Sequence, residues 1–209
     1  MAADSEVADD APVSPLYRTD RMNALSDGVF SIVLTLLVLD LKLPERNESI
    51  LTLMADDWHV FLAWLISFIA IARFWLVHHA ITATLLQCHA RTLALNFGVL
   101  GAVTLVPFSA DIIGTERVQE PWSTVLFAVN LGLLSLTLGL LASHAVSEPH
   151  LRHPGHSDDV LGRHLHQHLY LLPAVTAAAA LLAFVEPYLA LGAIAAEFLV
   201  FGWLSGRRR

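Results

Sequence analysis

Long apolar runs separated by short polar segments constrain this chain more than any other feature. The hydrocarbon core of a bilayer is about 30 Å thick and needs about 20 helical residues to cross it. Six stretches reach or approach that length, at about 24–41, 58–81, 93–113, 122–143, 169–185 and 188–204. Only Glu186-Pro187 separates the last two, and proline cannot continue the preceding helix without losing a hydrogen bond, so a tight hairpin is expected there. One long kinked helix is the alternative, and it would leave five spans.

The composition indicates the same class of protein. Only 15% of the 209 residues are charged, against about a quarter in a typical soluble domain. The chain is therefore predicted to be an all-α integral membrane protein with a disordered acidic tail at 1–16, six helices within 17–206 and a basic tail at 207–209. The acidic start is unlike that of a signal peptide, so the first helix is expected to stay in the mature protein.

The basic residues predict the orientation of the spans. With six spans both termini lie on one side, and that side carries nine of the twelve basic residues. Cytoplasmic loops carry an excess of Lys and Arg, so both termini are predicted to be cytoplasmic. A five-span chain would put the arginines at 207–209 outside, so the bias favours six spans. The longest loop, at about 144–167, is then cytoplasmic.

Arg21, Ser26 and Asp27 open the first apolar run, and they permit two interpretations. Asp and Ser near a helix N-terminus accept hydrogen bonds from free backbone amides and suit the helix dipole, which predicts a capping role. Alternatively, the three side chains form a polar network that ties the first helix to its neighbours at a pore mouth. The spacing alone favours capping, because capping is common.

In the middle of the same run only Ser31 and Thr35 are polar. On a 3.6-residue period Ile32, Thr35 or Leu36, and Leu39 share one face. That stripe either faces lipid or a neighbouring helix, with the threonine bonded to its own helix, or lines a pore. In a pore the aliphatic side chains would form a dewetted constriction, and the threonine would supply an oxygen. The residues alone favour the first interpretation.

The second run ends in ARFWLVHHAI, which contains Arg73, Trp75, His78 and His79. Adjacent histidines on a helix point about 100° apart and cannot share one ion, which disfavours a haem or metal pair. A hydrogen bond to a carboxylate on the same side of the membrane, such as that of Asp27, is the expected role of these histidines.

The later polar residues suggest structural roles. Asn96 is expected to hydrogen-bond across helices, and Pro107 to kink or loosen its helix. His164 and His168 share a helical face but lack a cysteine or an HExxH carboxylate, so a solvated, pH-sensitive loop is expected there and no metal site. The chain has no phosphate loop, GxSxG elbow or dinucleotide fingerprint. No enzyme activity, cofactor or nucleic-acid partner is therefore predicted.

The order of residues in the first three runs resembles one known family. Arg21, then LSDGVF at 25–30 and LTLLVLD at 34–40, resemble the first span of the transmembrane protein 175 family. That family comprises the endosomal and lysosomal potassium channel and its prokaryotic relatives, and its signature is an arginine followed by Phe-Ser-Asp. Further residues resemble its second and third spans: Ser67, Phe68, Ile71, Ala72, Trp75, His78, His79, Arg91, Asn96, Pro107 and Phe108. The resemblance covers about 21–113, and Leu25 departs from it where the signature has phenylalanine.

The resemblance implies six helices per chain, a homotetramer in the bilayer and a central pore lined by the first helices. The implied pore residues are Ile32, Thr35, Leu36 and Leu39. The implied packing network, distinct from ion ligands, comprises Arg21, Ser26, Asp27, Trp75, His78, His79 and Asn96. The implied activity is passive, leak-type K⁺ conduction across the cell (inner) membrane, with K⁺ as permeant ion and no cofactor.

Two other functions are compatible with the residues. A proton-permeable channel, or a proton-coupled small-solute transporter, would use a titratable group at mid-membrane; the first span has none, and Glu197 in the last run is the exception. An intramembrane enzyme or haem protein would be built around His78 and His79. In the channel, a ring of threonine hydroxyls would replace water around a weakly hydrated cation. Aliphatic side chains cannot hold an ion tightly, so modest selectivity and slow conduction are expected.

Overall fold

The computed structural model describes residues 16–41, 49, 51, 57–114, 119–154 and 158–206, without the side chains of 40, 158–160 and 201–206. The tails predicted at 1–16 and 207–209 lie, apart from residue 16, outside this part of the chain. The helices are α1 (Thr19–Leu36), α3 (Trp58–Thr82), α4 (Ala90–Thr104), α5 (Val106–Gly114), α6 (Pro121–Ser147), α7 (Asp158–His166), α8 (Leu172–Leu182) and α9 (Pro187–Gly206). Turns of 3₁₀ helix follow α1 (Leu37–Asp40) and α6 (Pro149–Leu151), and a π-helical turn, Gln167–Leu171, joins α7 to α8.

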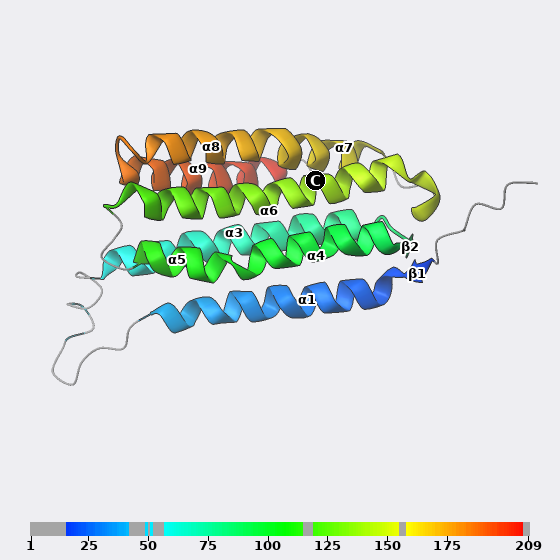
Figure 1. The fold of residues 1–209 in the computed structure, drawn as a ribbon, viewed down its shortest axis with the longest axis horizontal. Coiled ribbons are helices and arrows are strands. Elements are labelled where there is room, and N and C mark those ends of the chain that lie inside the picture. Colours follow the sequence, from blue (N-terminus) through cyan, green and yellow to red (C-terminus); the bar gives the residue numbers. More distant parts are fainter. Residues whose placement is uncertain are drawn as a thin grey trace, which may run out of the picture.

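The helices lie side by side in one antiparallel bundle (Figure 1). Five are long and apolar enough to cross a membrane, over Thr19–Leu39, Trp58–Thr82, Ala90–Gly114, Pro121–Ser147 and Leu161–Leu182, and a shorter apolar helix covers Pro187–Val200. α6 is central, with 56% of its most apolar window buried, whereas α1 lies at one edge of the bundle with 28% buried. The predicted all-helical membrane fold is confirmed in this general form.

α1 begins earlier than the expected residue 24, and the cause is a small sheet. Strand β1 (Tyr17–Arg18) pairs antiparallel with β2 (Gln87–Cys88), which follows α3. The Thr19 hydroxyl then donates to the carbonyl of Leu85 at 3.1 Å. These contacts hold the start of α1 at the end of α3, so Arg18 is the residue that precedes the helix. Ser26 and Asp27 therefore lie about two turns inside α1, and the capping role that their spacing alone favoured is wrong.

Strand β2 contains the only cysteine of the sequence. Cys88 is fully buried. Burial raises the pKa of its thiol, because an ionised sulfur loses its hydration there. The thiol is thus a poor nucleophile.

The span expected at 93–113 is two helices, because α4 ends at Thr104 and α5 begins at Val106. Pro107 has no N–H to donate to the carbonyl four residues earlier, so an unbroken helix would lose a hydrogen bond there. The expected kink or loosening at Pro107 is thus a break at Leu105, two residues earlier, within one candidate span, Ala90–Gly114.

The loop expected at about 144–167 is largely helical. α6 continues to Ser147. α7 begins at Asp158 and continues through the π-helical turn into α8, so the helical segment expected to begin at residue 169 begins 11 residues earlier. At its other end α8 stops at Leu182, short of the expected 185. The loop prediction failed because this segment is rich in histidine, and such a composition is typical of a solvated loop.

Two of those histidines are buried against other helices. The Nε2 atom of His144 lies 3.1 Å from the Thr92 hydroxyl, and the Nδ1 atom of His168 lies 3.0 Å from the Ser135 hydroxyl. A bundle can bury a polar side chain wherever a neighbouring helix supplies a partner. The histidine-rich segment is therefore not simply a solvated loop.

The π-helical turn packs closely on α6. Gly132, Ser135 and Gly139 lie at spacings of three and four, on one face of α6. A Cβ added at Gly139 would meet the backbone nitrogen of Leu169 at 2.7 Å and its Cα at 2.8 Å. Small residues in such a row allow helix backbones to approach closely in membranes.

Gly139→Ala is therefore expected to destabilise the protein by about 1–3 kcal/mol, because the added methyl group would force two helix backbones apart. Gly101→Ala is the matched control, since nothing lies within 4 Å of a Cβ at that position of α4. There, alanine is expected to be neutral or slightly stabilising through its helix propensity. Thermal unfolding of both variants in detergent measures the difference, and equal midpoints would contradict the prediction.

The last two helices form a hairpin. α8 ends at Leu182, α9 begins at Pro187, and the two run antiparallel side by side (Figure 1). The hairpin expected at Glu186-Pro187 is thus present, and the alternative of one long kinked helix is excluded.

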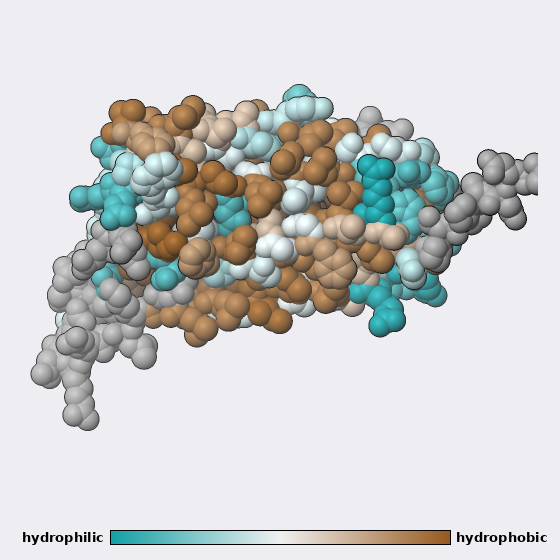
Figure 2. All heavy atoms as spheres, viewed as in Figure 1, coloured by the Kyte–Doolittle hydropathy of each residue, from teal (hydrophilic) through white to brown (hydrophobic). Residues whose placement is uncertain are grey.

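Apolar side chains cover most of the middle of the bundle surface, and polar ones gather at its two ends (Figure 2). The core between the helices is also apolar and includes Phe30, Phe74 and Phe127, each almost completely buried. A bundle whose middle lies in hydrocarbon is expected to be apolar both inside and outside, because lipid tails are as apolar as its core.

Candidate functional site

α1 has two faces of different character. Its buried residues Met22, Ser26, Phe30 and Val33 recur every three or four positions and pack against the bundle, and Leu37 of the following 3₁₀ turn continues that row. The opposite side of the helix is exposed over much of its length. Within the part of the chain that the structure describes, α1 therefore packs through one narrow face.

The four residues predicted to line a pore are all exposed. The exposed fractions are 59% for Ile32, 42% for Leu36 and 74% for Leu39, and Thr35 is exposed as well. Large apolar side chains are also exposed on the other helices, Leu76 on α3 among them, as expected where a helix faces lipid. Exposure thus leaves the stripe free for a pore, but the role of these four residues stays a prediction.

The Thr35 hydroxyl is bonded to its own helix. Its oxygen lies 2.8 Å from the carbonyl oxygen of Ile32 and 3.2 Å from that of Ser31. The hydroxyl has one hydrogen, which it donates to this backbone, and two lone pairs that can still accept. The oxygen can therefore coordinate a cation without giving up its hydrogen bond.

Three of the predicted network residues meet in the interior. Ser26 of α1, His78 of α3 and Asn96 of α4 are each 1% exposed or less. The Asn96 side chain donates from Nδ2 to Ser26 Oγ at 3.0 Å, and its Oδ1 lies 2.7 Å from His78 Nε2. A carbonyl oxygen only accepts, so His78 carries its proton on Nε2. Ser26 in turn donates to the Met22 carbonyl at 2.9 Å. We call Ser26, His78 and Asn96 the buried triad.

A second group lies beside the triad on the outer surface. Trp75 donates from Nε1 to Asp27 Oδ1 at 2.9 Å, and its ring stacks on that of His79 with centroids 5.6 Å apart. The expected hydrogen bond between Asp27 and the histidine pair is absent among the described contacts. The partners differ from the expectation because Asn96, on a third helix, occupies the hydrogen-bonding Nε2 atom of His78.

Arg21 is the predicted network residue that stands apart. Its side chain is exposed on the first turns of α1, and no hydrogen bond or ion pair joins it to the described residues. The structure thus divides the seven predicted residues into a buried triad, an outer group of three, and Arg21, which joins neither group. Together the two groups join α1 to α3 and α4.

Arg73 makes a contact that the sequence analysis did not anticipate. Its Nη1 atom donates to the carbonyl oxygen of Phe198 at 3.1 Å, which ties α3 to α9. A charged residue inside an apolar run was the available signal, because such residues usually have a partner within the bundle. Among the described residues, no group of three or more potential ligands could hold a metal ion.

Comparisons with known proteins point to one family. The family model for the endosomal/lysosomal potassium channel TMEM175 matches residues 21–107. A potassium channel of Chamaesiphon minutus is 31% identical over 140 residues, which cover 64% of this chain and 68% of the relative. The endosomal/lysosomal proton channel TMEM175 of Danio rerio is 34% identical over 80 residues, covering 34% and 15% of the two chains.

A solved structure extends the similarity to nearly the whole chain. The crystal structure of a lysosomal potassium-selective channel TMEM175 homolog from Chamaesiphon minutus superposes with a TM-score of 0.76 and 26% identity, over 90% of this chain and 97% of that one. The fold and these similarities define an ion channel of the membrane, a class that is not enzymatic. The chain belongs to the TMEM175 family.

Proposed function

We propose that the chain is a potassium-permeable, leak-type channel that assembles as a homotetramer around a pore lined by α1. The observation that carries the proposal is the outer face of α1, an exposed aliphatic stripe interrupted by the single oxygen of Thr35. The pore residues are Ile32, Thr35, Leu36 and Leu39. The names of the bacterial relatives, which are potassium channels, support K⁺ as the permeant ion.

Six spans and cytoplasmic termini belong to the same proposal. α9 has 20 residues, about the length that crosses a hydrocarbon core. A sixth span would return the chain to the end of the bundle where α1 begins, and nine of the twelve basic residues would then lie on that side. The positive-inside rule then supports cytoplasmic termini in the cell (inner) membrane.

The chemistry of the stripe supports passive conduction with modest selectivity. A cation that crosses a narrow aliphatic ring loses its hydration, which is costly unless oxygens replace the water. Four Thr35 hydroxyls, one from each copy, would supply such oxygens at one level of the pore. The aliphatic side chains above and below offer no ligand, so an ion would not be held tightly.

Proton permeation through the same pore is the second candidate, because a vertebrate relative is named a proton channel. The residues between Gly28 and Leu39 include no titratable side chain, so protons would have to move along water beside Thr35. A proton-coupled solute transporter would instead require Glu197 of α9, which lies on another helix.

The proposal is tested by flux through the protein in liposomes, with separate gradients of K⁺, Na⁺ and H⁺. Thr35→Val removes the hydroxyl but keeps the side-chain volume. We expect it to lower K⁺ flux about tenfold, because the lost contact between the ion and the hydroxyl oxygen is comparable to one hydrogen bond, and about 1.4 kcal/mol corresponds to a factor of ten. Thr35→Ser keeps the hydroxyl and should retain most of the flux. Equal K⁺ and Na⁺ fluxes in all three proteins would contradict the assignment, and a larger H⁺ flux than K⁺ flux would favour the second candidate.

A further inference from the structure

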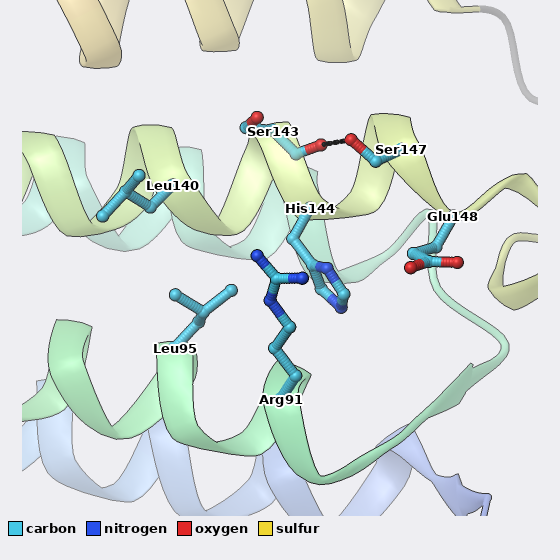
Figure 3. Close-up of a pocket in the computed structure, with 7 residues that line it drawn as sticks. All are labelled: Arg91, Leu95, Leu140, Ser143, His144, Ser147 and Glu148. Atoms are coloured by element: carbon cyan, nitrogen blue, oxygen red, sulfur yellow. Dashed lines mark hydrogen bonds between the residues drawn. The ribbon is translucent and has the colours of Figure 1, made fainter. Parts of the chain in front are cut away.

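A cavity of about 120 Å³ lies between the beginning of α4 and the end of α6. Figure 3 shows its lining residues: Arg91, Leu95, Leu140, Ser143, His144, Ser147 and Glu148. One water molecule needs a cavity of about 10–15 Å³ on the same measure, so this space admits a much larger group.

The cavity has a cationic wall. Arg91 lies in the first turn of α4, and in Figure 3 its guanidinium points towards α6 between Leu95 and His144. Within the described residues Arg91 has no ion pair. A guanidinium has five N–H donors in a planar fork that suits a phosphate group. This charge is therefore available to a ligand.

The other walls match the chemistry of a lipid. Leu95 and Leu140 lie on the side nearer the middle of the bundle, and Leu140 is 42% exposed. Ser143 and Ser147 are small, so they leave the space open. The cavity lies where the apolar spans Ala90–Gly114 and Pro121–Ser147 begin and end, which is the level of the lipid headgroups.

Glu148 distinguishes between possible phosphates. Its carboxylate lies at the far end of the cavity from Leu95 (Figure 3), and its Oε2 is 3.5 Å from His150 Nδ1. A carboxylate at the rim repels an anion that enters the cavity, and it repels a doubly charged anion more than a singly charged one. A phosphodiester carries one negative charge, whereas free inorganic phosphate carries up to two near neutral pH.

We propose that this cavity binds the phosphodiester headgroup of a membrane phospholipid. Arg91 contacts the phosphate, and Leu95 and Leu140 contact the apolar part of the lipid, on the side nearer the middle of the bundle. The site lies away from the exposed stripe of α1. It depends on the membrane position of the bundle and not on which ion the protein conducts.

The test is native mass spectrometry of the delipidated protein titrated with phosphatidylglycerol, with diacylglycerol as the probe that lacks the phosphate. We expect phosphatidylglycerol to bind the wild type and Arg91→Gln to weaken that binding at least about tenfold, equivalent to about 1.4 kcal/mol. Arg163→Gln is the matched control, because Arg163 is also exposed and lies on α7 near the same end of the bundle. It removes the same charge and should bind as the wild type does.

A second variant addresses the cavity itself. Ser143→Leu fills the space while Arg91 is kept, so it should also weaken binding, and it decides the question if Arg91→Gln does not fold. Equal binding by the wild type, Arg91→Gln and Ser143→Leu would overturn the proposal. Binding of diacylglycerol as strong as that of phosphatidylglycerol, or competition by inorganic phosphate at equal concentration, would overturn it too.

Discussion

Leu39→Ala is expected to raise K⁺ flux through the reconstituted protein by about tenfold or more. Leu39 is the most exposed side chain of the proposed pore stripe, at 74%, and it lies in the 3₁₀ turn that follows α1. In a homotetramer the substitution would shorten four side chains at the same level. A wider, better hydrated opening lowers the cost of dehydrating the ion, and each 1.4 kcal/mol removed from a barrier is about tenfold in rate.

The measurement is K⁺-driven flux in liposomes at matched protein content. Leu76→Ala is the control, because Leu76 is also an exposed leucine, at 57%, but lies on α3. It should leave the flux unchanged. If the two variants behave alike, the outer face of α1 faces lipid and not a pore.

Asn96→Leu is expected to lower stability by about 2–4 kcal/mol. Asn96 is the central member of the buried triad and bonds Ser26 on one side and His78 on the other. Leucine keeps the branched shape of asparagine but leaves the buried His78 without its hydrogen-bond partner and Ser26 with only its bond to Met22. A buried polar group left unpaired costs about 1–3 kcal/mol, and the lost bond to Ser26 adds to that cost. The loss should separate α1 and α3 from α4 before it affects the rest of the bundle.

Unfolding of the purified variants in detergent, followed by tryptophan fluorescence, measures this loss. Thr104→Val is the control on the same helix, because the exposed Thr104 hydroxyl donates to the carbonyl of Gly101 in its own α4. That change should stay within about 0.5 kcal/mol. Adding His78→Phe to Asn96→Leu should recover part of the stability, since it removes the imidazole that Asn96→Leu leaves unpaired. Equal losses in Asn96→Leu and Thr104→Val would refute the structural role of the triad.

The triad also explains how α1 is oriented in its own chain. Its contacts, together with the bond between Asp27 and Trp75, connect α1 to two other helices near one end of the bundle. With Ser26 turned inward, the 3.6-residue period turns Ile32, Thr35 and Leu39 outward. The polar network, whose residues lie outside the stripe, thus determines which residues of α1 face outward.

Some features followed from the sequence because their causes are local. Apolar runs of bilayer length identified the membrane class and placed α3. Pro107 predicted a kink or a loosening, and Glu186-Pro187 a hairpin, from backbone chemistry alone. The helix at Asp158–His166 was missed, because its polar composition is equally typical of a loop.

The sequence by itself determined the membrane class, the positions of the apolar runs and the resemblance to the TMEM175 family, since each depends on composition or on residue order within one segment. Only the tertiary structure decided which polar groups meet. Ser26 and Asn96 are 70 residues apart in the chain, and Asp27 and Trp75 are 48 apart. Local rules made Ser26 and Asp27 a helix cap, but the pairing of β1 with β2 starts the helix two turns earlier. The bonds of Ser26 and Asp27 depend on which helix faces pack together, and that packing is a property of the whole bundle.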